Sequence, residues 1–339
     1  MPPSLRWRGK LRLLAPRAAD VELPAHPPPR ASGRPPRAIA VGAVCVTRIF
    51  QVEQVPALPA KVMARRMAEL VDGMALSAAC AFARLGGEAA IWARIGDDPP
   101  GLAARAALAA EGLDVSGLRA LPGAASSQAS VIVDGRGERL VVPFHDPSLD
   151  ASALWLPLSA LAQADMLLCD VRWPEGAEAA LHAARAAGVP AMLDGEVAAP
   201  GVLERLAPLA SHAVFSDAGL LAFSGAGSVD RALREVAAAL AESAVHVGAT
   251  CGAEGYAWFE RGTIRRVSAP AVPVVDTLAA GDVFHGSFAL ALALGLDIEP
   301  AAQRACHAAS FKCARFGGRL GCPSRAELDA FIASGSLPG

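Results

Sequence analysis

Short apolar runs alternate with alanine-rich stretches over most of this chain, and this alternation restricts the fold more than any other feature. Runs of strand-like composition lie at 38–44, 88–95, 165–171, 190–194, 212–216 and 244–249, with helix-like stretches such as 99–111 and 175–187 between them. Alanine is the best helix former, and short apolar strands separated by helices are typical of a mainly parallel sheet covered on both faces. We therefore predict an α/β, doubly wound fold for residues 38–335.

Two segments interrupt the alternation. Residues 49–70 are polar, with Lys61, Arg65 and Arg66 set among apolar residues, and 128–144 has strand-like runs on both sides of the turn signal Asp134-Gly135-Arg136-Gly137. A turn of this composition between two strands predicts a β-hairpin. We expect these parts to form a small β lid, at about 47–73 and 127–147, beside the α/β body.

The first 37 residues differ in composition from the rest. They are rich in arginine and contain the run Pro27-Pro28-Pro29, so they are expected to be a disordered leader. A targeting segment is the alternative, although the prolines disfavour an amphipathic helix.

Charge and cysteine content exclude several classes of protein. The formal net charge is −2, which gives no indication of nucleic acid or a membrane surface as a partner. The seven cysteines are scattered without a CxxC pair, so neither a zinc site nor a disulfide framework is expected, and reduced thiols in a cytoplasmic protein are favoured. No apolar run reaches the ~18 residues that span a bilayer.

The segment Val275-Asp276-Thr277-Leu278-Ala279-Ala280-Gly281-Asp282 places small residues and an aspartate where a helix is predicted to begin, at about Gly281–Gly295. A helix N-terminus offers unpaired N–H groups and a partial positive charge, and anions bind there. Asp282 would lie beside the bound group and could take a proton from an attacking hydroxyl, which favours phosphoryl transfer. The alternative is that these aspartates only cap the helix.

This segment resembles the D-T-x-G-A-G-D signature of the ribokinase (PfkB-type) carbohydrate kinases. Further segments that resemble the family are 42–47, 96–98, 250–255 and 312–318, so the resemblance covers roughly 38–335. Within the family, the segments 126–128, 137–139, 170–173 and 276–287 are most similar to sulfofructose kinases and next to ketohexokinases. The resemblance implies a sheet of about eight or nine strands with a β lid, ATP as donor, Mg²⁺, and transfer to a small-molecule sugar acceptor. It also implies a homodimer through the lid.

The resemblance assigns candidate residues to three parts of a site. The catalytic base is Asp282, and the anion hole is the backbone of Ala279, Ala280 and Gly281. The nucleotide side comprises Thr250, Gly252, Gly255, Thr277, Ser310 and Lys312, with a solvated lysine as the equally weighted alternative for Lys312. On the acceptor side the matching positions are Thr47 and Gly73. Apart from the resemblance, Asp72 is a candidate substitute for the missing carboxylate, and the lid cations Lys61 and Arg139 would suit a sulfonate or phosphate, with ordinary strand-edge charge as the alternative. The sequence assigns no metal ligands.

Three positions depart from the family pattern. Thr47 stands where an aspartate is usual, Met74 follows Gly73 where a second glycine is usual, and Ala279 replaces the first glycine of the signature. A positive φ at Ala279 would be strained. Two functions therefore stay open: an ATP-dependent sugar kinase, or a catalytically weakened relative that binds nucleotide or sugar. A nucleoside kinase has little aromatic support, and an oxidoreductase lacks G-x-G-x-x-G.

Overall fold

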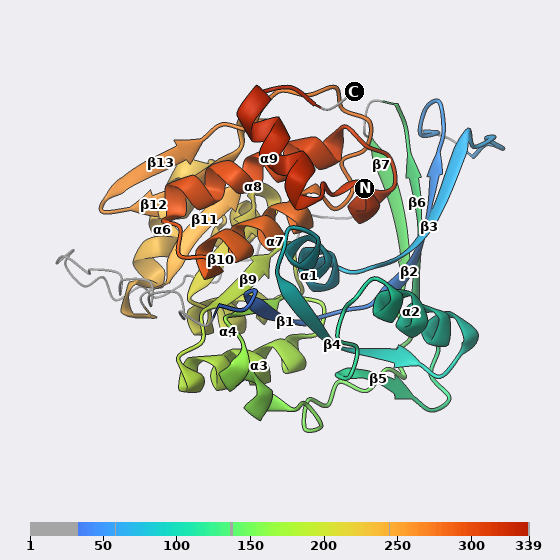
Figure 1. Ribbon diagram of the computed structural model, residues 1–339, viewed down its shortest axis with the longest axis horizontal. Coiled ribbons are helices and arrows are strands. Elements are labelled where there is room, and N and C mark those ends of the chain that lie inside the picture. Colours follow the sequence, from blue (N-terminus) through green and yellow to red (C-terminus); the bar gives the residue numbers. More distant parts are fainter. Residues whose placement is uncertain (1–32, 58, 136–137, 244, 338–339) are drawn as a thin grey trace, which may run out of the picture.

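The computed structural model describes residues 33–57, 59–135, 138–243 and 245–337, and its main element is a nine-stranded sheet (Figure 1). The strand order is β13-β12-β11-β10-β9-β8-β1-β4-β5. Its strands are β1 (Arg37–Val41), β4 (Glu88–Gly96), β5 (Leu118–Leu121), β8 (Met166–Cys169), β9 (Ala191–Gly195), β10 (His212–Ser216), β11 (His246–Thr250), β12 (Tyr256–Glu260) and β13 (Thr263–Val267). All neighbouring pairs are parallel except β11–β12 and β12–β13.

The strand order reverses direction at β1. The chain passes from β1 to β4 on one side and later to β8 on the other, so a topological switch point lies between β1 and β8. In open α/β sheets, ligands bind outside the carboxyl ends of strands at such a point. The fold thus directs attention to the residues that follow Val41 and Cys169.

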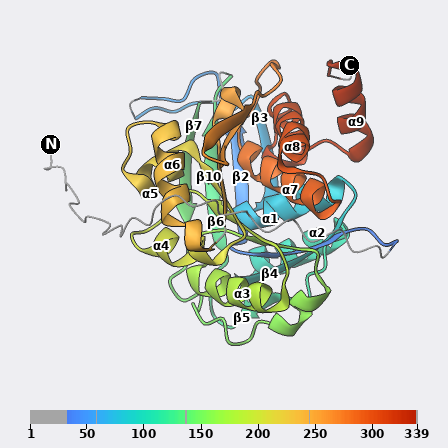
Figure 2. The same cartoon turned by 90° about the vertical axis from the view of Figure 1, so that its left-hand side faces the viewer.

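Helices cover both faces of the sheet (Figure 2). One buried cluster contains residues of α1, α2, α7, α8 and α9, and the other contains residues of η1, α3, α4, α5 and α6. Their bounds are α1 (Met74–Arg84), α2 (Pro99–Ala110), α3 (Pro174–Ala187), α4 (Val202–Leu206), α5 (Asp217–Ser224), α6 (Val229–Ala239), α7 (Ala280–Ala293), α8 (Ile298–Cys313), α9 (Arg325–Ser334), η1 (Leu158–Gln163), η2 (Ala207–Leu209), η3 (Ala241–Ser243), η4 (Gly252–Glu254) and η5 (Gly318–Gly321). The predicted doubly wound fold is confirmed.

A second sheet forms the lid, with strand order β3-β2-β6-β7. It consists of β2 (Cys45–Gln51), β3 (Arg66–Asp72), β6 (Ser127–Val133) and β7 (Arg139–Phe144), and it stands against the edge of the body in Figure 1. Its inner face buries Ile49, Leu70, Val131 and Val133 against Leu278 and Phe316 of the body. Its outer face exposes apolar side chains, including Met67, Val142 and Phe144.

The predicted segments differ from the observed ones mainly at their ends. The helix predicted at about Gly281–Gly295 runs from Ala280 to Ala293, because Gly295, with φ 87°, turns the chain away from the helix axis. Most of the predicted leader lies outside the described residues, but Arg37 already belongs to β1 and Arg34 pairs with Asp165 at 2.8 Å. Among the described helices, none combines the length and the apolar character needed to cross a membrane.

Candidate active site

The N-terminus of α7 presents backbone N–H groups that lack partners. Ala279 is the N-cap, with φ 62° and ψ 14°, and its side chain makes no capping bond. The Ala280 N–H donates to the Thr277 carbonyl at 3.2 Å, whereas the N–H groups of Ala279, Gly281 and Asp282 have no acceptor among the described residues. The αL turn at Ala279 therefore leaves the N–H groups of Ala279 and Gly281, both predicted for an anion hole, and that of Asp282 at a helix start, where anions bind. The anion hole at 279–281 stays a prediction.

Asp282 lies in the first turn of α7 and is half-buried. Burial raises the pKa of its carboxyl well above the usual range, and the charges of Asp194, Asp72, Asp170 and Glu196 raise it further. A carboxylate with a raised pKa is a stronger base. The arrangement can accept a proton from a hydroxyl placed next to an anion on the free amides.

The acceptor side of the candidate site lies at the switch point. Asp170, which is fully buried, accepts hydrogen bonds from the N–H groups of Ala43, Ala75 and Arg172 at 3.2, 3.1 and 2.8 Å, and so joins the ends of β1 and β8 to the first turn of α1. A Cβ on Gly73, whose φ is 145°, would overlap with the Ala43 carbonyl oxygen. Gly73 is therefore required by the close approach of α1 to β1.

Asp72 and Thr47 face the same side of the lid sheet. Asp72 opposes Cys45 and Thr47 opposes Leu70, so both belong to the inner face with the buried Ile49. The Thr47 hydroxyl has only the Cys45 sulfur, at 3.8 Å, as a described partner, and Asp72 accepts a hydrogen bond from the Ser77 hydroxyl at 2.6 Å. The charge of Asp72 also raises the pKa of Asp282. We refer to Asp72, Asp170, Asp194, Glu196 and Asp282, whose charges interact in this way, as the carboxylate cluster.

The two lid cations do not lie together at the acceptor side. Lys61 is exposed in the loop 52–65, beyond the end of the lid where Gln51 pairs with Arg66, and no described contact joins it to the carboxylate cluster. Arg139 donates to the Thr277 hydroxyl at 3.0 Å, beside the segment that leads into α7. The structure thus separates Lys61 from the site and places Arg139 next to the anion hole.

The residues predicted for the nucleotide side lie at the end of β11, in the turn that follows it and on α8, with Thr277 before α7. Thr250 ends β11, where its hydroxyl is 3.4 Å from the Phe215 carbonyl oxygen, and Gly252 and Gly255 have φ of 55° and 91° in the turn before β12. A Cβ on Gly255 would overlap with the Val267 carbonyl oxygen. Ser310 is buried on α8.

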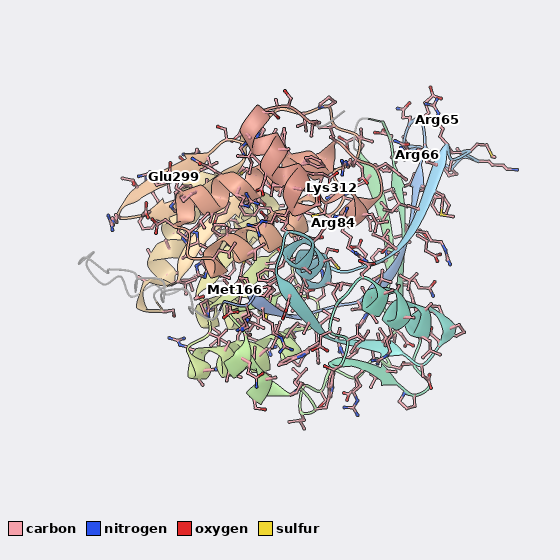
Figure 3. The ribbon with its side chains drawn as sticks, viewed as in Figure 1. Arg65, Arg66, Arg84, Met166, Glu299 and Lys312 are labelled. Atoms are coloured by element: carbon pink, nitrogen blue, oxygen red, sulfur yellow. The ribbon has the colours of Figure 1, made fainter. Side chains whose placement is uncertain are left out.

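Lys312 corrects both interpretations made from the sequence. It is neither solvated nor open to a ligand pocket, because its side chain has 0% exposure. Figure 3 labels it within the layer of C-terminal helices. Its Nζ donates to the Asp276 carbonyl oxygen at 2.5 Å and lies 3.4 Å from Asp276 Oδ2.

Sequence reasoning assigned no role in the candidate site to Asp170, Asp194, Glu196 or His285. His285 Nδ1 donates to the Gly281 carbonyl at 2.7 Å and lies 3.7 Å from Asp194 Oδ2. Burial raises the pKa of Asp194 to about 6, against the opposing charge of His285. The available signal was acidic residues at or just beyond the carboxyl ends of apolar strands, at 170, 194 and 196.

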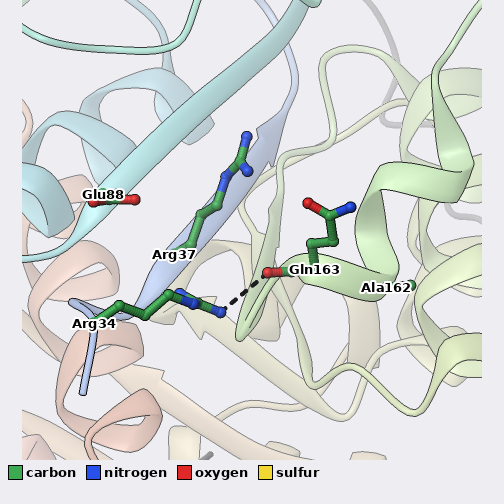
Figure 4. A pocket seen from close by; sticks show the side chains of 5 residues that line it. All are labelled: Arg34, Arg37, Glu88, Ala162 and Gln163. Carbon is green, nitrogen blue, oxygen red and sulfur yellow. Dashed lines mark hydrogen bonds between the residues drawn. The ribbon is translucent and has the colours of Figure 1, made fainter. Parts of the chain in front are cut away.

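Two further features bear on ligands. No group of three or more His, Cys, Asp or Glu side chains in the described part of the chain is placed to hold a metal ion. A pocket lined by Arg34, Arg37, Glu88, Ala162 and Gln163 lies at the amino ends of β1 and β4, opposite the carboxylate cluster (Figure 4). Its arginines are already paired, with Asp165 and Asp114.

Comparison with known proteins agrees with this geometry. A family model described as "pfkB family carbohydrate kinase" matches residues 36–325. The chain is 26% identical to a ribokinase of Bacillus subtilis over 297 residues, which cover 86% of this chain and 98% of that protein. It is 27% identical to a fructokinase of Klebsiella pneumoniae over 248 residues, which cover 67% of this chain and 78% of that protein.

Solved structures give the same result. A candidate ribokinase from Agrobacterium tumefaciens is 39% identical, with a TM-score of 0.84 over 88% of this chain and 98% of that chain. A ribokinase of Arabidopsis thaliana complexed with ribose and ATP has a TM-score of 0.73 at 22% identity, covering 88% and 99% of the two chains. An E. coli protein in complex with ATP and Mg²⁺ has a TM-score of 0.75 at 21% identity, covering 88% and 99%. The last two show likeness of fold alone.

Proposed function

The chain belongs to the pfkB family of carbohydrate kinases, which makes it an ATP-dependent phosphotransferase with an alcohol acceptor, and we propose that Asp282 is its catalytic base and the start of α7 its anion hole. One observation carries the proposal: the free amides of Ala279, Gly281 and Asp282 lie at the same helix end as the Asp282 carboxylate. Phosphoryl transfer needs positioning and charge stabilisation more than covalent chemistry, and both are available at that helix end.

In the proposed reaction, the Asp282 carboxylate takes the proton of a sugar hydroxyl while the hydroxyl oxygen attacks the γ-phosphorus of ATP. The bond from phosphorus to the bridging oxygen of the β-phosphate breaks, and ADP leaves with that electron pair. The free amides of α7 bind oxygens of the transferring group, on which negative charge is spread. We propose that Thr250, Gly252 and Gly255 contact the nucleotide at the carboxyl end of β11.

Mg²⁺ fits this site as an ion that arrives with the nucleotide. Mg²⁺ is usually held by one or two carboxylates together with substrate phosphates. Glu196 is partly exposed, and its charge raises the pKa of Asp282, so we propose it as a carboxylate that would hold the ion. When bound, the ion would neutralise charge on the phosphate oxygens. The absence of a three-ligand cluster in the described residues agrees with a site completed by ATP.

The charge around Asp282 favours an uncharged sugar. The charges of Asp72, Asp170, Asp194 and Glu196 all raise the pKa of Asp282. Arg172 opposes this effect at Asp170, and His285 and Arg172 oppose it at Asp194. Such a negative surrounding repels an acceptor that carries a sulfonate or phosphate. We therefore propose an uncharged ketose or aldose in preference to the sulfosugar class that the sequence suggested, with Thr47 and Asp72 binding its hydroxyls.

The alternative of a catalytically weakened relative loses one of its arguments. Ala279 adopts the left-handed conformation that glycine favours at this position of the signature, so the methyl group strains the turn without changing its shape. The departures at Thr47 and Met74 are the observations that still support this alternative.

The test is a coupled assay of ADP release over uncharged, sulfonated and phosphorylated sugars, with wild type, Asp282→Asn and Asp230→Asn. Loss of the base should lower kcat by about 10²–10⁴-fold while ATP binding is retained. Asp230 lies on α6 in an exposed ion pair with Arg266, so its substitution is a matched control that should keep kcat. Equal turnover by wild type and Asp282→Asn would remove Asp282 from the mechanism.

We further propose that two copies pair through the outer face of the lid. Leu140, Val142 and Phe144 of β7 and Met67 of β3 are exposed on the same outer face, at the two edges of a sheet whose inner face is already packed. Exposed apolar faces of this kind mark interaction sites. Light scattering should give the mass of a dimer for wild type and of a monomer for Phe144→Glu; a monomeric wild type would contradict the pairing.

A further inference from the structure

Lys312 is a charged side chain with 0% exposure, and its partners lie in the segment that leads into the anion hole. Its Nζ donates to the carbonyl oxygen of Asp276 at 2.5 Å and lies 3.4 Å from the carboxylate of the same residue. Burial lowers the pKa of Lys312, and the charge of Asp276 opposes that effect. A buried ion pair is weak evidence for stability, since apolar residues of equal volume often serve as well.

Asp276 is the point where two loops meet. Its carboxylate, also 0% exposed, accepts hydrogen bonds from the N–H groups of Leu278, Gly317 and Gly318 at 2.8, 2.9 and 2.8 Å. The N–H groups of Val275 and Asp276 donate to the Cys313 carbonyl at 2.8 and 3.1 Å. The segment 275–278 is therefore fixed to the end of α8, on which Lys312 is the penultimate residue.

The free amides begin immediately beyond this fixed segment. Only Leu278 separates Thr277 from the αL turn at Ala279, and the Thr277 carbonyl accepts the hydrogen bond of Ala280 that closes the turn. A shift of the Asp276 carbonyl is thus transmitted over three residues to the amides that face the phosphate. In phosphoryl transfer, a misplacement of about 1 Å costs roughly 10²-fold in rate.

We propose that Lys312 is a positioning residue for the transfer, acting through the Asp276 carbonyl to set the direction of the Gly281 and Asp282 amides. The proposal rests on the proposed function of the α7 N-terminus. Lys312 touches neither substrate in this arrangement, so its effect is on the placement of the transferring phosphoryl group and not on the sugar.

The competing explanation is that the pair only stabilises the fold, and two readouts separate the explanations. A positioning residue affects kcat and the binding of the terminal phosphate, whereas a stabilising residue affects the folded fraction alone. The deciding readouts are kcat and the nucleotide preference, because the Lys312–Asp276 pair contacts the segment that leads into α7.

The experiment compares full-length wild type, Lys312→Met and Arg304→Met. Arg304 lies on the same helix in a surface ion pair with Asp329, so the control makes an equivalent loss of charge away from Asp276. Circular dichroism and thermal melting give the folded fraction, and steady-state kinetics give kcat and both KM values. Calorimetry gives the ratio of dissociation constants for ADP and a non-hydrolysable ATP analogue.

Lys312→Met is expected to lose about 10²-fold in kcat per folded molecule and to lose its preference for the ATP analogue over ADP. Arg304→Met should match wild type in both. If Lys312→Met does not fold, Lys312→Met/Asp276→Asn takes its place, because removing both charges leaves no uncompensated ion in the interior. Wild-type kcat and nucleotide preference in the folded variant would overturn the proposal.

Failure of the proposed function has a different signature. In that case wild type itself binds nucleotide without transferring phosphate to any acceptor, while the nucleotide preference still reports on Lys312. If wild type turns over and the variant does too, only the inference about Lys312 is wrong.

Discussion

Replacing Ala279 with glycine should stabilise this protein, although glycine substitutions usually do the opposite. Ala279 has φ 62° and ψ 14°, a left-handed conformation in which the Cβ atom crowds the following carbonyl oxygen. Glycine has no Cβ and adopts this conformation without strain. The substitution therefore removes a steric penalty at the turn that begins α7.

The net effect is a difference between two terms. Relief of the strain of the left-handed conformation raises the free energy of unfolding by about 1–2 kcal/mol. The greater freedom of glycine in the unfolded chain lowers it by about 0.4–1 kcal/mol. The expected gain in the free energy of unfolding is thus between about 0 and 1.6 kcal/mol, with a middle value of about 0.8 kcal/mol that corresponds to an increase of about 1–3 °C in Tm for a domain of this size.

Differential scanning calorimetry of wild type, Ala279→Gly and Ala280→Gly measures the effect. Ala280 is the first residue of α7 and does not share the positive φ, so glycine there should lower the free energy of unfolding by up to about 1 kcal/mol. Neighbouring residues with the same side chain are expected to respond with opposite sign. A Tm for Ala279→Gly at or below that of Ala280→Gly would refute the reasoning.

Two further substitutions test other parts of the structure. The pKa of Asp282 is raised in the folded state, so ionisation of its carboxyl destabilises the fold once the pH exceeds the unfolded-state pKa. Asp282→Asn removes this charge and should therefore raise Tm at pH 7–8. In melting experiments at different pH values, the gain should disappear below about pH 4. A Cβ on Gly286 would overlap with the Ala78 carbonyl oxygen where α7 crosses α1, so Gly286→Ala should cost about 1–3 kcal/mol in urea unfolding. Gly281→Ala on the same helix meets nothing within 4 Å and should cost nothing, and an equal loss in both variants would contradict this packing argument.

The sequence predicted the architecture because its strongest signals are local. The alternation of strands and helices and the hairpin around Asp134-Gly135 both depend on neighbours in sequence, and both were found. Register and boundary errors were limited to a few residues, where tertiary contacts decide which residue ends an element.

The site was less predictable because it depends on residues far apart in the chain. Nothing near Lys312 in sequence indicates that its ammonium would be buried against Asp276, 36 positions away. The joining of β1, β8 and α1 by Asp170 likewise depends on a strand order that no local pattern encodes. The φ of Ala279 follows from the turn that Thr277 and Ala280 close, not from the preference of alanine.

The lid rests on the same two loops that Asp276 joins. Leu278 and Phe316 pack beneath its strands, and Arg139 of β7 reaches the Thr277 hydroxyl. A movement of the lid over a sugar would therefore also move the segment 275–278 that leads into α7. A movement of that segment would likewise move the lid. By thermodynamic reciprocity, we expect each substrate to alter the dissociation constant of the other by a common factor, so that the two bind as a heterotropic pair.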